Sequence, residues 1–142
     1  MSVYAESSAV LAWLLGEDQG RRTEQELAAA DLVVTSDLTL IECDRVLGRS
    51  AALGERNAAE AAKRRATLGA ASEHWVVLAI DSEVVARSRQ AFPREPVRSL
   101  DAIHLSTALL ARNLVAELQV LSLDGRVREN AAALGFDIAP AD

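Results

Sequence analysis

The sequence predicts an α/β protein in which helices cover both faces of a parallel sheet. Short apolar segments alternate along the chain with longer segments whose apolar residues recur at helical spacing. The short segments are continuous apolar runs, as expected of strands buried on both faces. The chain has 142 residues and is half apolar, which suits one domain with a single core. We therefore expect a single domain spanning residues 1–142.

Five segments are predicted as strands because they are short, mostly apolar and separated by turn residues or helices. They are Val3–Ala5, Leu32–Thr35, Trp75–Ile80, Leu118–Leu121 and Phe136–Ile138. The order of strands and helices along the chain indicates a parallel sheet. In such sheets, ligands bind beyond the carboxyl ends of the strands.

The helices of the N-terminal half are recognised by their caps and by apolar residues that share one face. The hydroxyl of Ser7 or Ser8 is expected to cap the first helix, and Gly16 is expected to end it. Three further helices are predicted in this half. They span Gln19–Ala30, Leu38–Leu53 and Asn57–Ala71.

The C-terminal half is predicted to contain three more helices and one long loop. Asp81 or Ser82 is expected to cap the helix that follows the third strand, and Ser99 to cap the next one. The segment Phe92–Val97 carries two prolines and is predicted to be a loop. The last two helices are predicted over Leu100–Arg112 and Asp124–Leu134.

Four acidic residues lie in segments that otherwise look like core: Glu6, Glu42, Asp101 and Asp124. An unpaired buried charge is very unfavourable, and no lysine or arginine is placed locally to neutralise all four. A hard divalent cation, which prefers oxygen ligands, is the simplest common partner. Glu6 and Asp124 each follow the carboxyl end of a predicted strand. We therefore expect the four carboxylates to converge at one edge of the sheet.

Each of these acids also has a local structural explanation. Asp101, in the first turn of a helix, interacts favourably with the helix dipole, and Asp124 forms a common turn pair with the glycine after it. Glu42 is placed to pair with Arg45 or Arg49 on the same helix, and Glu6 to accept a capping hydrogen bond. Only the occurrence of all four in one chain favours a shared site.

Other reactive side chains give weaker signals. We interpret His104, three residues after Asp101, as a packed helix histidine and not as a base or ligand. The single cysteine, Cys43, excludes an internal disulfide and is interpreted as a buried, inert thiol in a reducing cytoplasm. Ser7, Ser8 and Ser122 are candidate hydrogen-bond donors to the neighbouring carboxylates.

Charge and motif content exclude several classes of protein. A formal net charge of −6 argues against a protein that holds nucleic acid by bulk charge, although it is compatible with a nuclease whose bound cations offset the charge locally. No apolar run is long enough to span a bilayer, and no secretory signal is evident, so we expect a cytoplasmic protein. The sequence has no glycine-rich phosphate loop, nucleophile elbow or CxxC pair.

Four segments of the chain resemble, in order, the signature blocks of PIN-domain proteins. They are YAESSAVLAWLLGE, TSDLTLIECDRVL, SLDAIHLSTAL and VLSLDGRVRENAAALGF. The chain is most similar to the VapC-type toxins of prokaryotic type II toxin–antitoxin pairs. This resemblance implies a three-layer α/β/α sandwich with a central, mostly parallel sheet and a metal-dependent ribonuclease site.

The resemblance also implies roles for particular residues. The family's four acids, which are catalytic and ligate Mg²⁺ or Mn²⁺, map onto Glu6, Glu42, Asp101 and Asp124. Its two hydroxyl residues near the cofactor map onto Ser7 and Ser122. The family usually has aspartate at the first position. Because Glu6 is one methylene longer, it would shift the metal or weaken its binding.

Activity and partners follow from the same resemblance. It implies an endoribonuclease that hydrolyses RNA phosphodiester bonds with a metal-activated water, a cognate VapB-like antitoxin and a homodimer. Two other functions stay open on the sequence alone. One is a catalytically degenerate PIN module that binds a protein, which the glutamate at position 6 would allow. The other is a metal-dependent phosphoesterase acting on small substrates.

Overall fold

One five-stranded sheet forms the centre of the computed structural model, which describes residues 1–142. The strands are β1 (Ser2–Ala5), β2 (Leu32–Ser36), β3 (Val76–Leu78), β4 (Leu118–Leu121) and β5 (Ile138–Ala139). They are arranged in the order β3-β2-β1-β4-β5, and every neighbouring pair is parallel. The predicted parallel sheet is therefore confirmed, with β1 at its centre.

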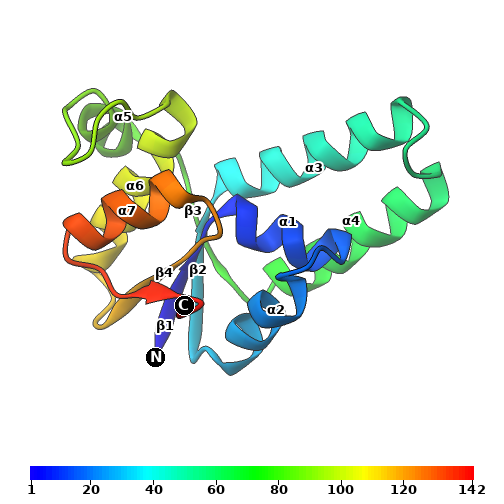
Figure 1. Cartoon of the computed structure of the whole chain (residues 1–142), viewed down its shortest axis with the longest axis horizontal. Coiled ribbons are helices and arrows are strands. Elements are labelled where there is room, and N and C mark those ends of the chain that lie inside the picture. Colours follow the sequence, from blue (N-terminus) through cyan, green and yellow to red (C-terminus); the bar gives the residue numbers. More distant parts are fainter.

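Seven helices cover the two faces of this sheet (Figure 1). They are α1 (Ser7–Leu15), α2 (Gly20–Ala29), α3 (Asp37–Ala52), α4 (Ala58–Ser72), α5 (Ser82–Ser88), α6 (Ser99–Arg112) and α7 (Gly125–Ala133). Helices α1 to α4 lie on one side, where α3 and α4 form a long hairpin that projects away from the sheet, and α5 to α7 lie on the other. The predicted three-layer α/β/α sandwich is confirmed.

The alternation of side chains along β1 divides the apolar interior into two cores. Val3 and Ala5 point to the side of α1 and pack in a cluster that includes Leu14. Tyr4 points to the opposite side and packs in a cluster with Leu105 of α6. All five side chains are almost fully buried. Because both faces of the strand are covered, the polar groups that follow it are carried directly into the interior at the end of the sheet.

Several predicted boundaries differ from the structure. The edge strand β3 is shorter than the predicted Trp75–Ile80, and β5 begins two residues later than predicted. Ser99 does not cap α6: Arg98 has the extended backbone of the capping position, so Ser99 is already the first helical residue. The cap of α1 is also not a serine, because the carboxylate of Glu6 accepts the backbone N–H of Ser8.

Close packing of α1 against α2 predicts a strongly destabilising substitution. A Cβ atom added at Gly20 would lie 2.3 Å from the carbonyl oxygen of Ala12, a backbone atom that cannot turn aside. We expect Gly20→Ala to lower the free energy of unfolding by about 1–3 kcal/mol in urea denaturation, because the two helices must separate. Gly69→Ala in α4 is the matched control, since nothing lies within 4 Å of its Cβ position, and it is expected to stabilise the protein. Equal unfolding midpoints for the two variants would contradict this account of the α1–α2 contact.

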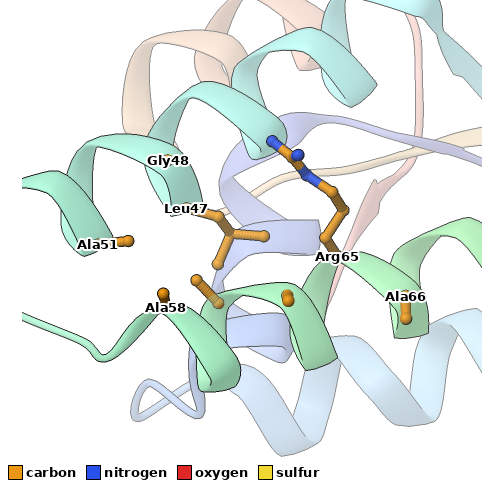
Figure 2. Close-up of a pocket in the computed structure, with 8 residues that line it drawn as sticks. Leu47, Gly48, Ala51, Ala58, Arg65 and Ala66 are labelled. Atoms are coloured by element: carbon orange, nitrogen blue, oxygen red, sulfur yellow. The ribbon is translucent and has the colours of Figure 1, made fainter.

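The hairpin of α3 and α4 forms an open, mostly apolar pocket of about 400 Å³ (Figure 2). Its lining is mostly alanine and consists of Leu47, Gly48, Ala51, Ala58, Ala61, Ala62, Arg65 and Ala66. None of the four acids found in the sequence lines this pocket, so it is separate from the candidate site. The helices of the structure are all too short or too polar to cross a membrane.

Candidate active site

The candidate site lies where the central strands end. Glu6 directly follows β1 and Asp124 lies three residues after β4, and these two strands are paired with Ala5 opposite Leu121. The carboxyl ends of parallel neighbours meet at one edge of the sheet, so both acids are brought to the same place. Asp101 enters from the first turn of α6 and Glu42 from α3. We refer to Glu6, Glu42, Asp101 and Asp124 as the acidic cluster.

Glu42 is brought to this edge by the packing of α3 against β1. The hydroxyl of Thr39 donates to the carbonyl oxygen of Ala5 at 3.3 Å, and Thr35 donates to the same oxygen at 2.6 Å. Thr39 and Glu42 are three residues apart and share one face of the helix. The bond from Thr39 therefore points Glu42 toward the residues that follow Ala5.

The carboxylate of Glu6 is almost fully buried and accepts hydrogen bonds on both oxygens. Ser7 Oγ lies 3.0 Å from Oε1 of Glu6 and 2.9 Å from Oε1 of Glu42, so its single hydroxyl hydrogen is shared between the two glutamates. Oε2 accepts from the backbone N–H of Ser8 at 3.1 Å, from the Ser8 hydroxyl and from Ser122 Oγ at 2.8 Å. These four donors replace the water that an exposed carboxylate would bind, which is how the fold accommodates a buried charge at this position.

Glu42 is held by two donors on a single oxygen. His104 Nε2 lies 2.6 Å from Oε1, and Ser7 Oγ donates to the same oxygen at 2.9 Å. Burial raises the pKa of Glu42, but the hydrogen bond and charge of His104 and the bond from Ser7 outweigh burial and hold the pKa below its usual value. Glu42 is therefore ionised at neutral pH. Ser7 contacts both Glu6 and Glu42 and so links the two glutamates directly.

Asp101 has a different environment, because like charges surround it. Burial raises its pKa, the charges of Asp124 and Glu6 raise it further, and the charges of His104 and Arg98 only partly oppose them. No group of the protein donates a hydrogen bond to the Asp101 carboxylate, so nothing of this kind compensates for its burial. A carboxyl group whose ionised form is disfavoured by neighbouring carboxylates is one that a cation would stabilise.

Asp124 has both a structural contact and a place in the cluster. Its Oδ1 accepts the backbone N–H groups of Arg126 and Val127, at 2.9 and 3.1 Å, and so caps α7. Its own N–H donates to Ser122 Oγ at 3.0 Å. The cap uses one carboxylate oxygen and leaves Oδ2 without a partner from the protein.

The donor set can be compared with what a divalent cation requires. The cluster offers only carboxylate and hydroxyl oxygens, the ligands that Mg²⁺ and Mn²⁺ prefer. No three His, Cys, Asp or Glu side chains surround a single point, however, so the protein does not form a closed metal cage. Mg²⁺ usually keeps several waters and takes only one or two carboxylates from the protein. Asp101 and Asp124, which keep uncommitted oxygens, fit such a site, whereas Glu6 would have to give up a hydrogen bond to ligate a metal.

Two further residues contact the acidic cluster. The sequence does not predict the first, His104, as a site residue, but it does predict the second, Ser8, as a hydrogen-bond donor to a neighbouring carboxylate. His104 is buried, as predicted for a packed helix histidine, but its ring also contacts Glu42, which lies 62 positions away. Ser8 joins the network through Glu6, and its hydroxyl also accepts the N–H of Leu123 at 2.9 Å. Cys43 is buried as predicted, and burial raises its pKa to about 12, which suits an inert thiol.

Fold and site together define an α/β/α protein that collects carboxylates and serine hydroxyls at the carboxyl edge of a parallel sheet. The chain belongs to the PIN-domain family, because the family's model matches residues 3–133. None of the curated protein sequences compared with the chain matches it significantly.

Solved structures with the same fold include several toxins. VapC20 from Mycobacterium tuberculosis, described as a sarcin–ricin loop cleaving toxin, is 16% identical with a TM-score of 0.64, over 94% of this chain and 95% of that one. A toxin–antitoxin complex from Klebsiella pneumoniae is 18% identical with a TM-score of 0.64, over 100% and 99% of the two chains. VapBC2 from Rickettsia felis, bound to a promoter DNA fragment, is 10% identical with a TM-score of 0.63, over 97% of each chain. At these identities the likeness shows the fold.

Proposed function

We propose that this protein is a metal-dependent endoribonuclease and the toxin of a VapBC-type toxin–antitoxin pair. The observation that carries the proposal is the convergence of Glu6, Glu42, Asp101 and Asp124 at the carboxyl edge of the sheet. Ser7 contacts both glutamates, Ser122 contacts Glu6 and Asp124, and burial and the charges of Asp124 and Glu6 raise the pKa of Asp101. Membership of the PIN-domain family and the shared fold of the VapC and VapBC structures support it.

Asp101 and Asp124 would hold Mg²⁺ or Mn²⁺ directly, with water completing the coordination. When bound, the cation would lower the pKa of a coordinated water and offset charge on the phosphoryl oxygens. Glu42, ionised at neutral pH, would orient the attacking water and accept its proton. Glu6 would not contact the metal. Through its hydrogen bonds from Ser7 and Ser122, it would fix the positions of the residues that surround the reacting groups.

RNA would approach along the exposed side of α3. Arg45 and Arg49 are exposed, lie four residues apart and follow Glu42 on that helix. Their guanidinium groups are suited to bidentate contacts with phosphates, which position a nucleic acid without reading its sequence. Cleavage by an activated water would leave a 5′-phosphate and a 3′-hydroxyl.

The proposed partner is a small VapB-like antitoxin, because the solved relatives include toxin–antitoxin complexes. The net charge of −6 complements a basic segment of such a partner. We further propose that the toxin acts in the cytoplasm, as a single domain and as a homodimer.

Cleavage of RNA by the purified protein tests this proposal. We expect structured RNA to be cut in the presence of Mn²⁺ or Mg²⁺ and to stay intact with EDTA. No lysine or arginine side chain forms an ion pair with the acidic cluster, so no positive charge of the protein can replace the metal. A generic small phosphodiester, assayed in parallel, should be a poor substrate. Cleavage that persists with EDTA would refute the proposed mechanism, and preference for the small phosphodiester would favour the phosphoesterase alternative.

A protein-binding module without catalytic activity is the second candidate. The hydrogen bonding of Glu6 favours it, because four donors already occupy the carboxylate that stands where the family usually has aspartate. Such a module would bind an antitoxin-like partner and neither bind Mn²⁺ nor cut RNA.

A further inference from the structure

His104 is fully buried in α6 and contacts side chains from three other elements. Its Nδ1 lies 2.9 Å from the hydroxyl of Tyr4 on β1. On the other side of the ring, Nε2 lies 2.6 Å from Oε1 of Glu42 on α3 and 3.2 Å from Oγ of Ser7 on α1. The imidazole thus connects the sheet, through Tyr4, to two residues of the candidate site.

The partners of the ring fix where its proton lies. The carboxylate of Glu42 is ionised and can only accept, so Nε2 carries the hydrogen of the shorter bond. Burial raises the pKa of Tyr4 well above its usual value, and the charge of Glu6 raises it further, so the phenol keeps its proton. Nδ1 faces the Tyr4 hydroxyl at 2.9 Å. Nε2 is therefore the nitrogen that holds Glu42, and Nδ1 is the nitrogen that contacts the sheet.

The two carboxylate oxygens of Glu42 differ in their hydrogen bonding. Both hydrogen bonds to this carboxylate, from His104 and from Ser7, end on Oε1. Oε2 accepts no hydrogen bond from the protein, and a quarter of the Glu42 side chain, 25%, is exposed. The network therefore holds one oxygen and leaves the other facing solvent.

We propose that His104 is a positioning residue for the reaction: it clamps Oε1 of Glu42 so that Oε2 points at the attacking water. This inference rests on the proposed nuclease function and goes beyond it by giving His104 a task that packing alone does not require. Tyr4 holds the other side of the ring through Nδ1. Any buried imidazole needs polar partners for its nitrogens, so the positioning role rests on the partner of Nε2, a carboxylate of the acidic cluster whose second oxygen accepts no hydrogen bond from the protein.

Kinetics of two substitutions separate positioning from packing. His104→Leu keeps bulk but removes the donor, and we expect it to lower kcat for RNA cleavage about 10- to 100-fold with little change in KM. His104→Gln can place an amide N–H near the position of Nε2, so it should recover at least tenfold over His104→Leu. His74→Gln, at an exposed histidine outside the site, is the control and should cleave at the wild-type rate. All variants are assayed well below their unfolding temperatures.

Nitrogen NMR of the metal-free protein gives a readout that is independent of activity and of folding of the variants. With only two histidines in the chain, spectra of the wild type and of His74→Gln assign the His104 ring. We expect the Nε2 signal of His104 to be that of a nitrogen that bears a hydrogen, as its 2.6 Å contact with Oε1 of Glu42 requires.

Three outcomes would overturn the inference. They are an Nε2 that bears no hydrogen, a folded His104→Leu variant that cleaves at the wild-type rate, and a His104→Gln variant of equal stability that is no better than His104→Leu. A wild-type protein that cleaves no RNA with Mn²⁺ would instead refute the proposed function, and the positioning role would fall with it.

Discussion

Replacing Asp101 with asparagine is expected to abolish RNA cleavage without destabilising the protein. Asn has nearly the same shape but no charge, so it cannot offset a divalent cation. Loss of several kcal/mol of charge stabilisation corresponds to a fall in kcat/KM on the order of a thousandfold. The rate is measured with saturating Mn²⁺ on the purified variant.

The stability of this variant follows from the direction of the pKa shift. The pKa of Asp101 is raised from its usual value of 3.8 in the folded state, because burial and the charges of Asp124 and Glu6 disfavour the ionised form. The ionised carboxylate therefore opposes folding at every pH above the folded-state pKa, and this penalty disappears below the unfolded-state pKa. Asp101→Asn removes the penalty, so without metal its Tm at pH 7 should equal or exceed that of the wild type. The advantage should vanish in acid.

Two results would contradict the assignment of Asp101. Full metal-dependent cleavage by a purified Asp101→Asn protein would remove it from the catalytic machinery. A Tm several degrees below that of the metal-free wild type would mean that the carboxylate is a structural anchor, which its lack of hydrogen bonds argues against.

Two substitutions at Asp124 are expected to separate its catalytic and structural contributions. Asparagine remains a good helix cap, so Asp124→Asn should keep the fold while lowering kcat/KM about a hundredfold or more, because the negative charge is lost. Asp124→Ala also loses the two hydrogen bonds that cap α7 and should unfold about 0.5–2 kcal/mol more easily. Activity assays and urea denaturation measure the two effects independently.

The comparison between these variants is informative because the charge is lost in both. If Asp124→Asn cleaved RNA like the wild type while Asp124→Ala was both unstable and inactive, Asp124 would be a helix cap only. The cluster would then lose one of its two proposed metal ligands.

The sheet and two of the four acids could be predicted from local sequence. Glu6 and Asp124 lie beyond apolar strands, and the carboxyl ends of parallel strands converge whatever the connections between them. Short edge strands contain few apolar residues by which to recognise them, which is why the predicted ends of β3 and β5 differ from the observed ones. The sequence offers one carboxylate and two serines as the cap of α1. The structure confirms the capping hydrogen bond predicted for Glu6, whereas the predicted serine cap is wrong.

The contacts of Glu42 and His104 could not be predicted in the same way. Glu42 reaches the site because Thr39 bonds the carbonyl of Ala5, a contact across 34 positions that no periodicity encodes. His104 meets Tyr4 across 100 positions. A buried histidine on an apolar helix face has the same local sequence whether its nitrogens meet packing atoms or functional carboxylates. Only the tertiary fold distinguishes these cases.

Calorimetric titration of the metal-free protein with Mn²⁺ tests most directly whether the carboxylates form a cation site. We expect saturable binding to the wild type and at least tenfold weaker binding to Asp101→Asn, with His74→Gln unchanged. No binding heat in the wild type, or the same affinity in Asp101→Asn as in the wild type, would contradict a metal site at the carboxyl edge of this sheet.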